Sequence, residues 1–282
     1  MNLTNDLDLP APFVRFAVSR MSTVPPQHLS VTRLIGPAWL RALTIRHWDE
    51  IEQDVADQVW ALFGTSVHDL LQRFSTESEL VEERIQLEVD GQIISGQPDI
   101  LALETGVLSD WKVSSAWSVV LGRKFDWEAQ LNLYALGLRQ AGRPVNAIQN
   151  VLFIRDWSRT QALRSADYPQ QMVVTIPYDL WPQAKTEAYI RERLAAHADP
   201  KPCSDEERWT RRGTWAVMKE GRKTALRVFE DEQQAEELAA QDEKYRVEHR
   251  PGEQVRCQSY CPVARFCDQW KRGEDENSLH GE

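Results

Sequence analysis

Cysteine is scarce in this 282-residue chain: there are only four, and all of them lie after residue 200. So few cysteines exclude a disulfide framework as the main source of stability. The sequence also lacks a secretory signal peptide and any apolar run of the roughly 20 residues that a membrane-spanning helix requires. Acidic residues outnumber basic ones, and the formal net charge of -10 excludes a generally basic nucleic-acid coat protein. We therefore expect a cytoplasmic globular protein with a sizeable core and no membrane contact.

The most informative segment runs from Gly96 to Lys112. Pro98-Asp99 precedes a short apolar run, and Asp110-Trp111-Lys112 lies within a second one, with Gly106 in the turn between them. This pattern predicts a β-hairpin. Residues two apart on a strand share a face, so Asp110 and Lys112 should project together, with Asp99 brought across from the neighbouring strand.

Two carboxylates and an ammonium group that converge on one point suit a hard divalent cation with a water molecule beside it. A site of this kind hydrolyses phosphodiester bonds. The alternative is a solvated hairpin that carries the same residues by accident, because both motifs are short.

Polar residues also flank this hairpin. Upstream, an amphipathic pattern over residues 49–74 predicts a helix that carries His68, four residues after Gly64. Such a histidine is either a hydrogen-bonded core residue or a ligand for Mn²⁺ or a similar metal. Downstream, Gln130 and Tyr134 lie one turn apart on a predicted helix over residues 126–141. They are either two polar residues at the edge of the apolar face of this helix or groups that hydrogen-bond a DNA phosphate.

Together, Gly64/His68, Asp99, Asp110/Lys112 and Gln130/Tyr134 resemble the RecB-like branch of the PD-(D/E)xK nuclease superfamily. This branch includes AddB-type, CRISPR-associated and bacteriophage-encoded nucleases, and the resemblance covers roughly residues 30–270. It implies a Mg²⁺- or Mn²⁺-dependent deoxyribonuclease, an exonuclease by expectation, that acts in DNA recombination, repair or phage replication.

The resemblance also implies roles for these residues. Asp99, Asp110 and the backbone carbonyl of Trp111 would ligate the catalytic metal, and His68 would complete its shell. Lys112 would orient or deprotonate the attacking water and offset charge in the transition state, and Gln130 and Tyr134 would hold the substrate backbone. Glu88 is a candidate carboxylate for a second metal.

The expected partners follow from the same resemblance. They are DNA, as single strands or duplex ends, and a helicase or recombination protein; a phage-encoded member would work in the cytoplasm of its bacterial host. The rival hypothesis is a non-catalytic DNA-binding or assembly subunit that keeps the nuclease fold. The complete Asp/Asp/Lys set argues against that rival.

The cysteines form a separate pattern. Cys257, Cys261 and Cys267 fall within eleven residues, and Cys203 precedes them. Four thiolates suit a [4Fe-4S] cluster or a Zn²⁺ ion, and four reduced thiols without metal are the third possibility. In RecB-like relatives a [4Fe-4S] cluster closes the nuclease domain, and Cys261-Pro262 and the five-residue gap before Cys267 match them. The first gap, three residues rather than two, and the late position of Cys203 depart from that pattern. The resemblance therefore favours a structural iron–sulfur cluster, with Zn²⁺ as the alternative.

Basic residues are concentrated in one window of this acidic chain, with Trp209 and Trp215 among them. Cations for phosphates and aromatic faces for bases predict a DNA contact, and a solvated charged face is the alternative. The candidate DNA-binding residues are Arg208, Arg211, Arg212, Arg222 and Lys223.

The alternation of strand and helix patterns predicts an α/β fold, a restriction-endonuclease-like core with a mixed sheet flanked by helices. We expect an irregular segment over residues 1–28 and the nuclease core over 29–200. A cysteine-bracketed strand-strand-helix-strand (ββαβ) subdomain with the C-terminal metal site should occupy 201–270, and a disordered acidic tail 271–282.

Overall fold

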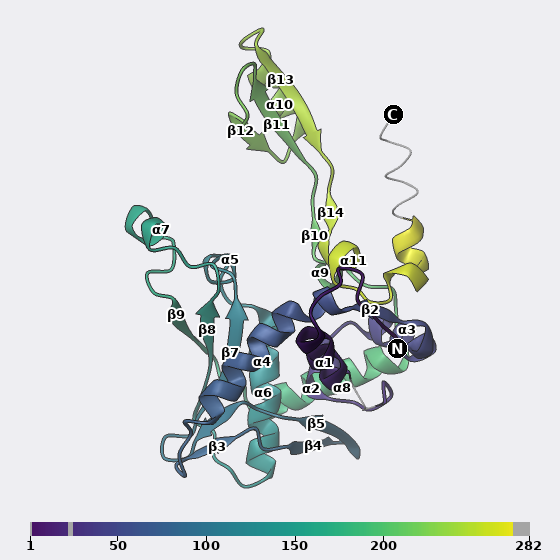
Figure 1. Ribbon diagram of the computed structural model, residues 1–282, viewed down its shortest axis with the longest axis vertical. Coiled ribbons are helices and arrows are strands. Elements are labelled where there is room, and N and C mark those ends of the chain that lie inside the picture. Colours follow the sequence, from purple (N-terminus) through teal and green to yellow (C-terminus); the bar gives the residue numbers. More distant parts are fainter. Residues whose placement is uncertain (1, 22–24, 273–282) are drawn as a thin grey trace. The chain divides into compact units, whose positions relative to one another are not determined.

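The computed structural model describes residues 2–21 and 25–272 (Figure 1). The chain divides into two compact units, Met1–Pro200 and Lys201–Glu282. The expected acidic tail falls, apart from Lys271 and Arg272, outside the described residues.

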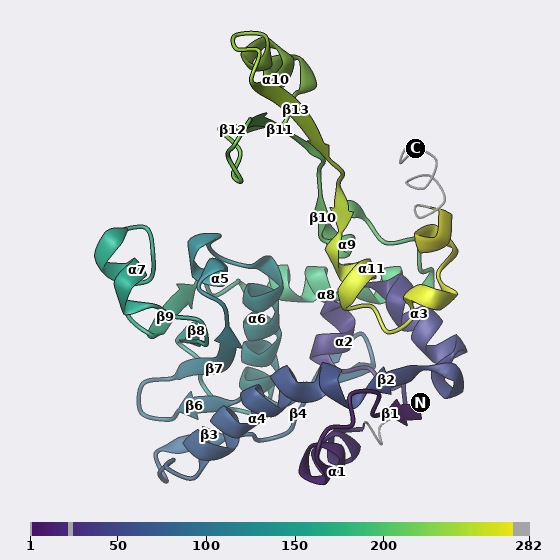
Figure 2. The same cartoon turned by 45° about the horizontal axis from the view of Figure 1, so that its top comes forward.

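The first unit is built on a five-stranded mixed sheet in the order β3-β6-β7-β8-β9 (Figures 1 and 2). Its strands are β3 (Glu79–Val81), β6 (Ile100–Ala102), β7 (Val107–Ser114), β8 (Ala147–Ile154) and β9 (Val173–Tyr178). β7 and β8 are parallel, and the other neighbouring pairs are antiparallel. Parallel neighbours need a crossover connection, and α6 (Phe125–Gln140) supplies it. The fold is a mixed α/β arrangement with helices flanking the central sheet.

α6 is the central helix of this unit. All ten of its residues from Ala129 to Leu138 are buried, because α6 contacts the sheet, the β4–β5 hairpin, α2 and α8. Gly137 lies against β4, and a Cβ there would lie 2.7 Å from Cδ1 of Ile85, so that only the end of this side chain would have to shift. The other helices are α1 (Ala11–Arg20), α2 (Val31–Ile35), α3 (Ala38–Arg46), α4 (Val59–Gln72), α5 (Trp117–Val120), α7 (Arg159–Arg164) and α8 (Gln183–Ala198).

The start of the chain is more ordered than the expectation of an irregular 1–28 segment. β1 (Asn2–Thr4) pairs in parallel with β2 (Glu52–Asp54), and α1 follows with a proline in its first turn. Proline fixes φ at a helical value there and loses no hydrogen bond, so these prolines start a helix rather than prevent one. The first compact unit includes this segment.

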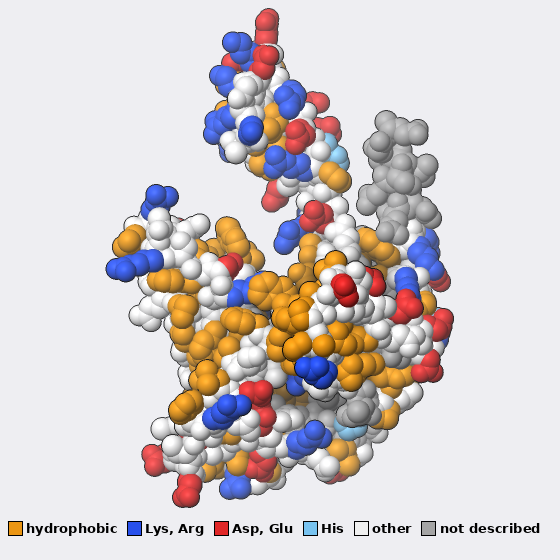
Figure 3. All heavy atoms as spheres, in the orientation of Figure 1, with side chains coloured by type: hydrophobic (Ala, Val, Ile, Leu, Met, Phe, Trp, Pro, Cys, Tyr) orange, Lys and Arg blue, Asp and Glu red, His pale blue; other side chains and the backbone are white. Residues whose placement is uncertain are grey.

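The predicted helix over residues 49–74 begins later, at Val59. Short 3₁₀ turns occupy Trp48–Glu50 and Val55–Gln58, and Asp54 caps the second one by accepting a hydrogen bond from the amide of Ala56. Pairing with β1 holds the intervening residues extended, which no local pattern reveals. α4 then packs along β7 with no fully buried side chain. Large side chains such as Trp60 and Phe63 remain exposed, as do other hydrophobic groups over the visible face (Figure 3).

The extended chain between residues 79 and 102 is divided among four short strands, β3 to β6. β4 (Ile85–Val89) and β5 (Gln92–Gly96) form a separate hairpin, turning at Asp90 and Gly91, both with positive φ. Pro98 lies between β5 and β6 and donates no backbone hydrogen bond, so the extended chain changes sheets there.

The second unit contains a three-stranded antiparallel sheet in the order β12-β11-β13. Its elements are β11 (Thr214–Lys219), β12 (Arg227–Phe229), α10 (Glu232–Ala239) and β13 (Tyr245–Arg250). The short strands β10 (Thr210–Arg211) and β14 (Glu253–Gln254) pair to form a stem below this sheet. The helices α9 (Asp205–Arg208) and α11 (Val255–Ser259) and a 3₁₀ turn at Ala264–Phe266 complete the unit.

No helix within the described ranges combines the length and the apolarity needed to cross a bilayer.

Candidate functional site

β7 presents the polar residues of the predicted hairpin at the centre of the sheet. Ile100 of β6 faces Ser109 of β7, so the register brings Asp99 beside Asp110. Asp110 and Lys112 project from the same face of β7, as their spacing predicts. The turn at residues 104–106 thus brings Asp99 towards Asp110 and Lys112, as expected from the sequence.

Asp110 is buried within a set of hydrogen-bond donors. Its Oδ2 lies 2.6 Å from Nζ of Lys112 and 3.0 Å from Nδ2 of Asn150, and its Oδ1 lies 3.3 Å from Nε2 of Gln130. A carboxylate with 2 % exposure is tolerated only when its charge is compensated in this way. Lys112 supplies the charge, and the two amides fix the orientation of the carboxylate.

Gln130 and Tyr134 join this cluster from α6. Oε1 of Gln130 accepts a hydrogen bond from Lys112 at 3.2 Å, and its Nε2 lies 3.1 Å from the Tyr134 hydroxyl. Burial raises the pKa of Tyr134 to about 12, so the phenol stays protonated at neutral pH. The amide and the phenol therefore connect α6 to β7 as one hydrogen-bonded chain.

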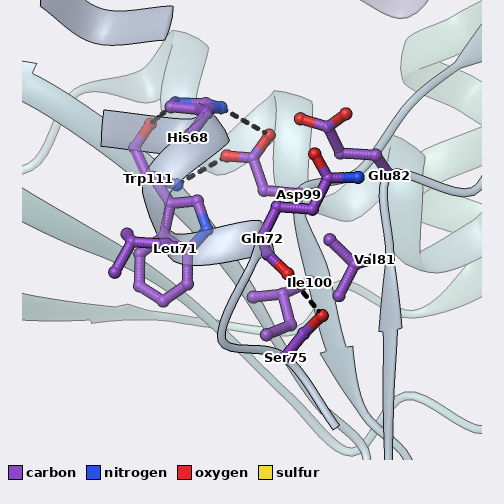
Figure 4. A pocket seen from close by; sticks show the side chains of 9 residues that line it. All are labelled: His68, Leu71, Gln72, Ser75, Val81, Glu82, Asp99, Ile100 and Trp111. Atoms are coloured by element: carbon purple, nitrogen blue, oxygen red, sulfur yellow. Dashed lines mark hydrogen bonds and ion pairs between the residues drawn. The ribbon is translucent and has the colours of Figure 1, made fainter. Parts of the chain in front are cut away.

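Asp99 is held by β7 on one side and faces α4 on the other (Figure 4). Its Oδ2 accepts a 2.6 Å hydrogen bond from the amide of Trp111, and its Oδ1 lies 3.4 Å from Nδ1 of His68. Nε2 of His68 donates to the carbonyl oxygen of Trp111 at 3.2 Å. If Nε2 carries the hydrogen, Nδ1 of a neutral imidazole directs a lone pair at the Asp99 carboxylate. A proton or a cation between these two atoms resolves that repulsion.

The ionisation of Asp99 reflects this setting. Burial raises its pKa to about 7, and the charges of Asp110 and Glu82 act in the same direction. The hydrogen bond from Trp111 and the charge of Lys112 oppose the rise. Asp99 is therefore partly protonated near neutral pH, and further positive charge beside it would favour the carboxylate.

A small cavity of about 10 Å³ adjoins Asp99, with room for about one water molecule. His68, Gln72 and Glu82 are among the side chains that surround it (Figure 4). The possible metal ligands here are carboxylate oxygens, one carbonyl oxygen and one imidazole nitrogen. This combination suits Mn²⁺, and the oxygen atoms alone would also suit Mg²⁺. Within the described ranges, however, no three His, Cys, Asp or Glu side chains are arranged to enclose a metal ion.

Two residues of this site were missed by the sequence analysis. Asn150 is fully buried on β8 opposite Asp110, and its Oδ1 has no hydrogen-bond partner. Glu82 donates its backbone amide to the carbonyl oxygen of Asp99 at 3.1 Å and has a left-handed φ of 48°. The one feature of the sequence that could have pointed to Glu82 as a site residue is its position just before a pair of strands.

Glu88, the candidate for a second-metal carboxylate, lies elsewhere. It is an exposed residue of β4, outside the five-stranded sheet, and Gln140 bonds its backbone at 3.0 and 2.9 Å. Glu82, and not Glu88, is the additional carboxylate beside Asp99.

The four cysteines all belong to the second unit, and none forms a disulfide bond. Burial raises the pKa of Cys203 to about 12, with contributions from Glu207 and from the other three thiols. Cys257 and Cys261 also have raised pKa values, first through burial. Nε2 of Gln269 donates to the carbonyl oxygen of Cys203 at 2.8 Å, which ties Cys203 to the segment that carries Cys267. In the part of the chain that the structure describes, however, these thiols are not gathered into a group of three or more side chains that could enclose a metal ion, so the expected cluster or zinc site stays a prediction.

The candidate DNA-binding residues of the second unit are dispersed. Arg208 pairs with Asp205 at 2.5 Å, and Arg211 pairs with Glu253 in the stem at 3.7 Å. Arg212 is exposed beside that stem, and Arg222 and Lys223 are exposed in the turn between β11 and β12. These five residues therefore do not form one continuous patch.

Comparison with known proteins gives little to set beside this geometry. No family model matches the sequence, and no curated protein matches it. Among solved structures, the chain is similar to the crystal structure of SSO0001, with a TM-score of 0.44 and 13% sequence identity, over 70% of this chain and 88% of that one.

Proposed function

We propose that this protein is a metal-dependent deoxyribonuclease with a RecB-like PD-(D/E)xK site. One observation carries the proposal: Asp99, Asp110 and Lys112 converge across the β6–β7 pair, and Lys112 contacts Gln130 at 3.2 Å. The side chains follow one another in the order of that superfamily's motifs. A solvated hairpin would leave these groups in water, whereas Asp99 and Asp110 are buried.

The donors near Asp99 fit a divalent cation. Asp99, Asp110, the Trp111 carbonyl and His68 would hold it, and such a cation supplies a nucleophilic hydroxide and charge for the pentavalent phosphorus. His68 is oriented for this task because its Nε2 is bound to Trp111, which leaves Nδ1 directed at the Asp99 side. Metal bound beside Asp99 would replace the proton that this carboxyl group otherwise partly retains near neutral pH.

Lys112 has the central role among the protein's own groups. Its ammonium, 2.6 Å from Asp110, is placed to orient a water molecule and to offset negative charge as the phosphodiester is attacked. Gln130 fixes the Lys112 ammonium from α6, and Tyr134 offers a protonated hydroxyl to a phosphate oxygen.

The test is cleavage of end-labelled single- and double-stranded DNA, linear and circular, in Mn²⁺, Mg²⁺ or EDTA. We expect metal-dependent loss of linear DNA by the wild type and none by Asp110→Asn. Degradation of circular DNA would identify an endonuclease rather than an exonuclease. If wild type and variant both bind DNA and cut none of it with any metal, the non-catalytic DNA-binding subunit replaces this proposal.

We also propose that Cys203, Cys257, Cys261 and Cys267 hold a structural [4Fe-4S] cluster, with Zn²⁺ as the alternative. Two features support a shared site: the spacing of Cys257, Cys261 and Cys267, and the hydrogen bond of 2.8 Å from Gln269 to the carbonyl oxygen of Cys203, which ties Cys203 to the segment that carries Cys267. The site would join the start of the second unit to its last helical turns, across the intervening strands.

A further inference from the structure

The three-stranded sheet of the second unit has two different faces. β12 and β13 both run antiparallel to β11, so they are parallel to each other and are connected through α10. A right-handed crossover of this kind places the helix over the face that carries Val217. In agreement, Lys219 on that face pairs at 3.7 Å with Asp242, which follows α10 closely. The opposite face has no helix of this subdomain upon it.

The aromatic residues of the sheet all belong to the helix-covered face. Trp215 faces both Phe229 and His249 in the strand register, and its ring centroid lies 5.0 Å from that of His249. Tyr245 faces Lys219, whose ammonium lies 5.3 Å from the ring. Trp215 is therefore packed inside the subdomain, and the expected alternation of cations with exposed aromatic faces is not present on this sheet.

The open face combines aliphatic and basic side chains. Ala216 and Met218 are buried along its centre, and Val228 is exposed beside them. Arg246 and Arg250 project from the same face, four residues or about 13 Å apart along β13, and the exposed Lys244 lies in the turn that immediately precedes this strand. Glu248 is the acidic residue between them and pairs with Arg250 at 3.6 Å.

Basic and acidic residues of this subdomain are divided between the strand segments and the helical segment. Residues 214–229 and 244–250, which form the strands and their turn, contain seven Lys and Arg and two Glu. Residues 230–243, which contain α10, have seven Asp and Glu and no Lys or Arg. Lysine and arginine side chains are visible on this part of the chain in Figure 3. Of these cations only Arg246, Arg250 and the adjoining Lys244 belong to the open face, where they outnumber Glu248, and such a local excess of positive charge in an acidic protein can attract a polyanion.

We propose that the open face of β12-β11-β13 binds duplex DNA without sequence preference, whether or not the first unit cuts it. Three features select this ligand. The bare face lacks aromatic side chains, so it has no platform on which unpaired bases can stack. The major groove of B-DNA admits a β-ribbon, whereas that of an RNA duplex is too deep and narrow. The cations lie in one row, which suits contacts to successive phosphates.

The experiment measures binding, independently of cleavage. Full-length Asp110→Asn protein in EDTA is titrated into a fluorescent 30-base-pair DNA duplex, and anisotropy is followed from about 50 to 300 mM salt. The variant Lys244→Ala/Arg246→Ala/Arg250→Ala is compared with Arg15→Ala/Arg20→Ala/Arg143→Ala, which removes the same charge from exposed positions of the first unit. We expect the sheet variant to bind about 30-fold more weakly near 0.1 M salt. We also expect the slope of log affinity against log salt to become shallower, by about one for each phosphate that the variant no longer binds.

The control variant should retain the affinity and slope of the parent protein. An unchanged slope in the sheet variant, or an equal loss in the control, would overturn the proposal. So would equally tight, equally sheet-dependent binding of single-stranded DNA or duplex RNA. Thermal unfolding of each variant checks that exposed substitutions leave the fold unchanged. Since no cleavage is measured, a failed nuclease test leaves this result intact.

Discussion

Nζ of Lys112 lies 2.6 Å from Oδ2 of Asp110, two residues earlier on β7. The ion pair is nearly enclosed, with 3 % of the Asp110 side chain and 23 % of the Lys112 side chain exposed. Removing one partner from such a pair leaves the other with an uncompensated charge in a poorly solvated place. Substitutions at the site therefore affect stability as well as activity, and the two effects must be measured separately.

For Asp110 the informative change is Asp110→Asn. The amide keeps the size of the side chain and one acceptor oxygen, so we expect a folded protein without detectable cleavage. Asp110→Ala should lose cleavage too, and in addition cost about 1–3 kcal/mol, because Lys112 and Asn150 lose their acceptor. Urea unfolding and a cleavage assay on both variants test this. Equal stabilities would show that the donors around Asp110 find other partners.

Asn150 should matter although it lies outside the recognised motifs. Its Nδ2 donates to Oδ2 of Asp110 at 3.0 Å from the adjacent strand β8, and so it positions the carboxylate. We expect Asn150→Ala to lower kcat about 10- to 100-fold, and Asn150→Asp to lower it further by adding a like charge. Gln149→Ala, one residue away, is the control, since Gln149 bonds Ser109 instead. Full activity of Asn150→Ala at saturating metal would remove Asn150 from the site.

The contrast between Asp99 and Asn150 shows which part of the site the sequence can predict. Asp99 meets Asp110 across a short turn, and the second apolar run of the predicted hairpin forms β7, Val107–Ser114. The alternation of apolar residues and the glycine in the turn are local features of the sequence, and they are enough to predict this pairing. Asn150 meets Asp110 through a parallel pairing forty residues apart, and no local pattern fixes such a register. The late start of α4 has the same kind of cause, since β2 pairs with the first residues of the chain.

Stability in EDTA should depend on pH through Asp99. Its pKa is about 7 in the folded protein and about 3.9 in an unfolded chain, so the folded state holds the proton more tightly. The contribution to stability is therefore largest below about pH 4 and decreases as the pH rises towards 7, by up to about 4 kcal/mol. Asp99→Asn should be more stable than wild type at pH 8, and this difference should shrink at pH 5. Urea unfolding at both values tests this, with the exposed Glu104→Gln as control. A difference that grows at pH 5 would contradict the direction of the shift.

Gly96 should be required for the placement of Tyr134. A Cβ at Gly96 would lie 2.9 Å from Cε1 of Tyr134 and 3.1 Å from Cγ1 of Ile85, so the phenol ring would have to move. We expect Gly96→Ala to cost about 1–3 kcal/mol and to reduce cleavage. Gly137→Ala is the matched control on α6: it meets mainly the flexible end of Ile85, and alanine favours a helix by about 1 kcal/mol. Comparable losses of activity in both variants would show that general packing, and not Tyr134, is responsible.

The cysteine site makes the last prediction. Because burial, first of all, raises the pKa of Cys203 to about 12, this thiol is protonated at neutral pH unless a metal replaces its proton. Cys261→Ser should therefore lose the metal and, with it, solubility and stability, whereas the nearby exposed Ser259→Ala should lose neither. Protein purified without oxygen is analysed for iron, acid-labile sulfide and zinc. Iron with sulfide identifies the cluster, and zinc identifies the alternative. Metal-free wild-type protein, or a soluble Cys261→Ser protein that still cuts DNA at the wild-type rate, would show that the four thiols do not hold the second unit together.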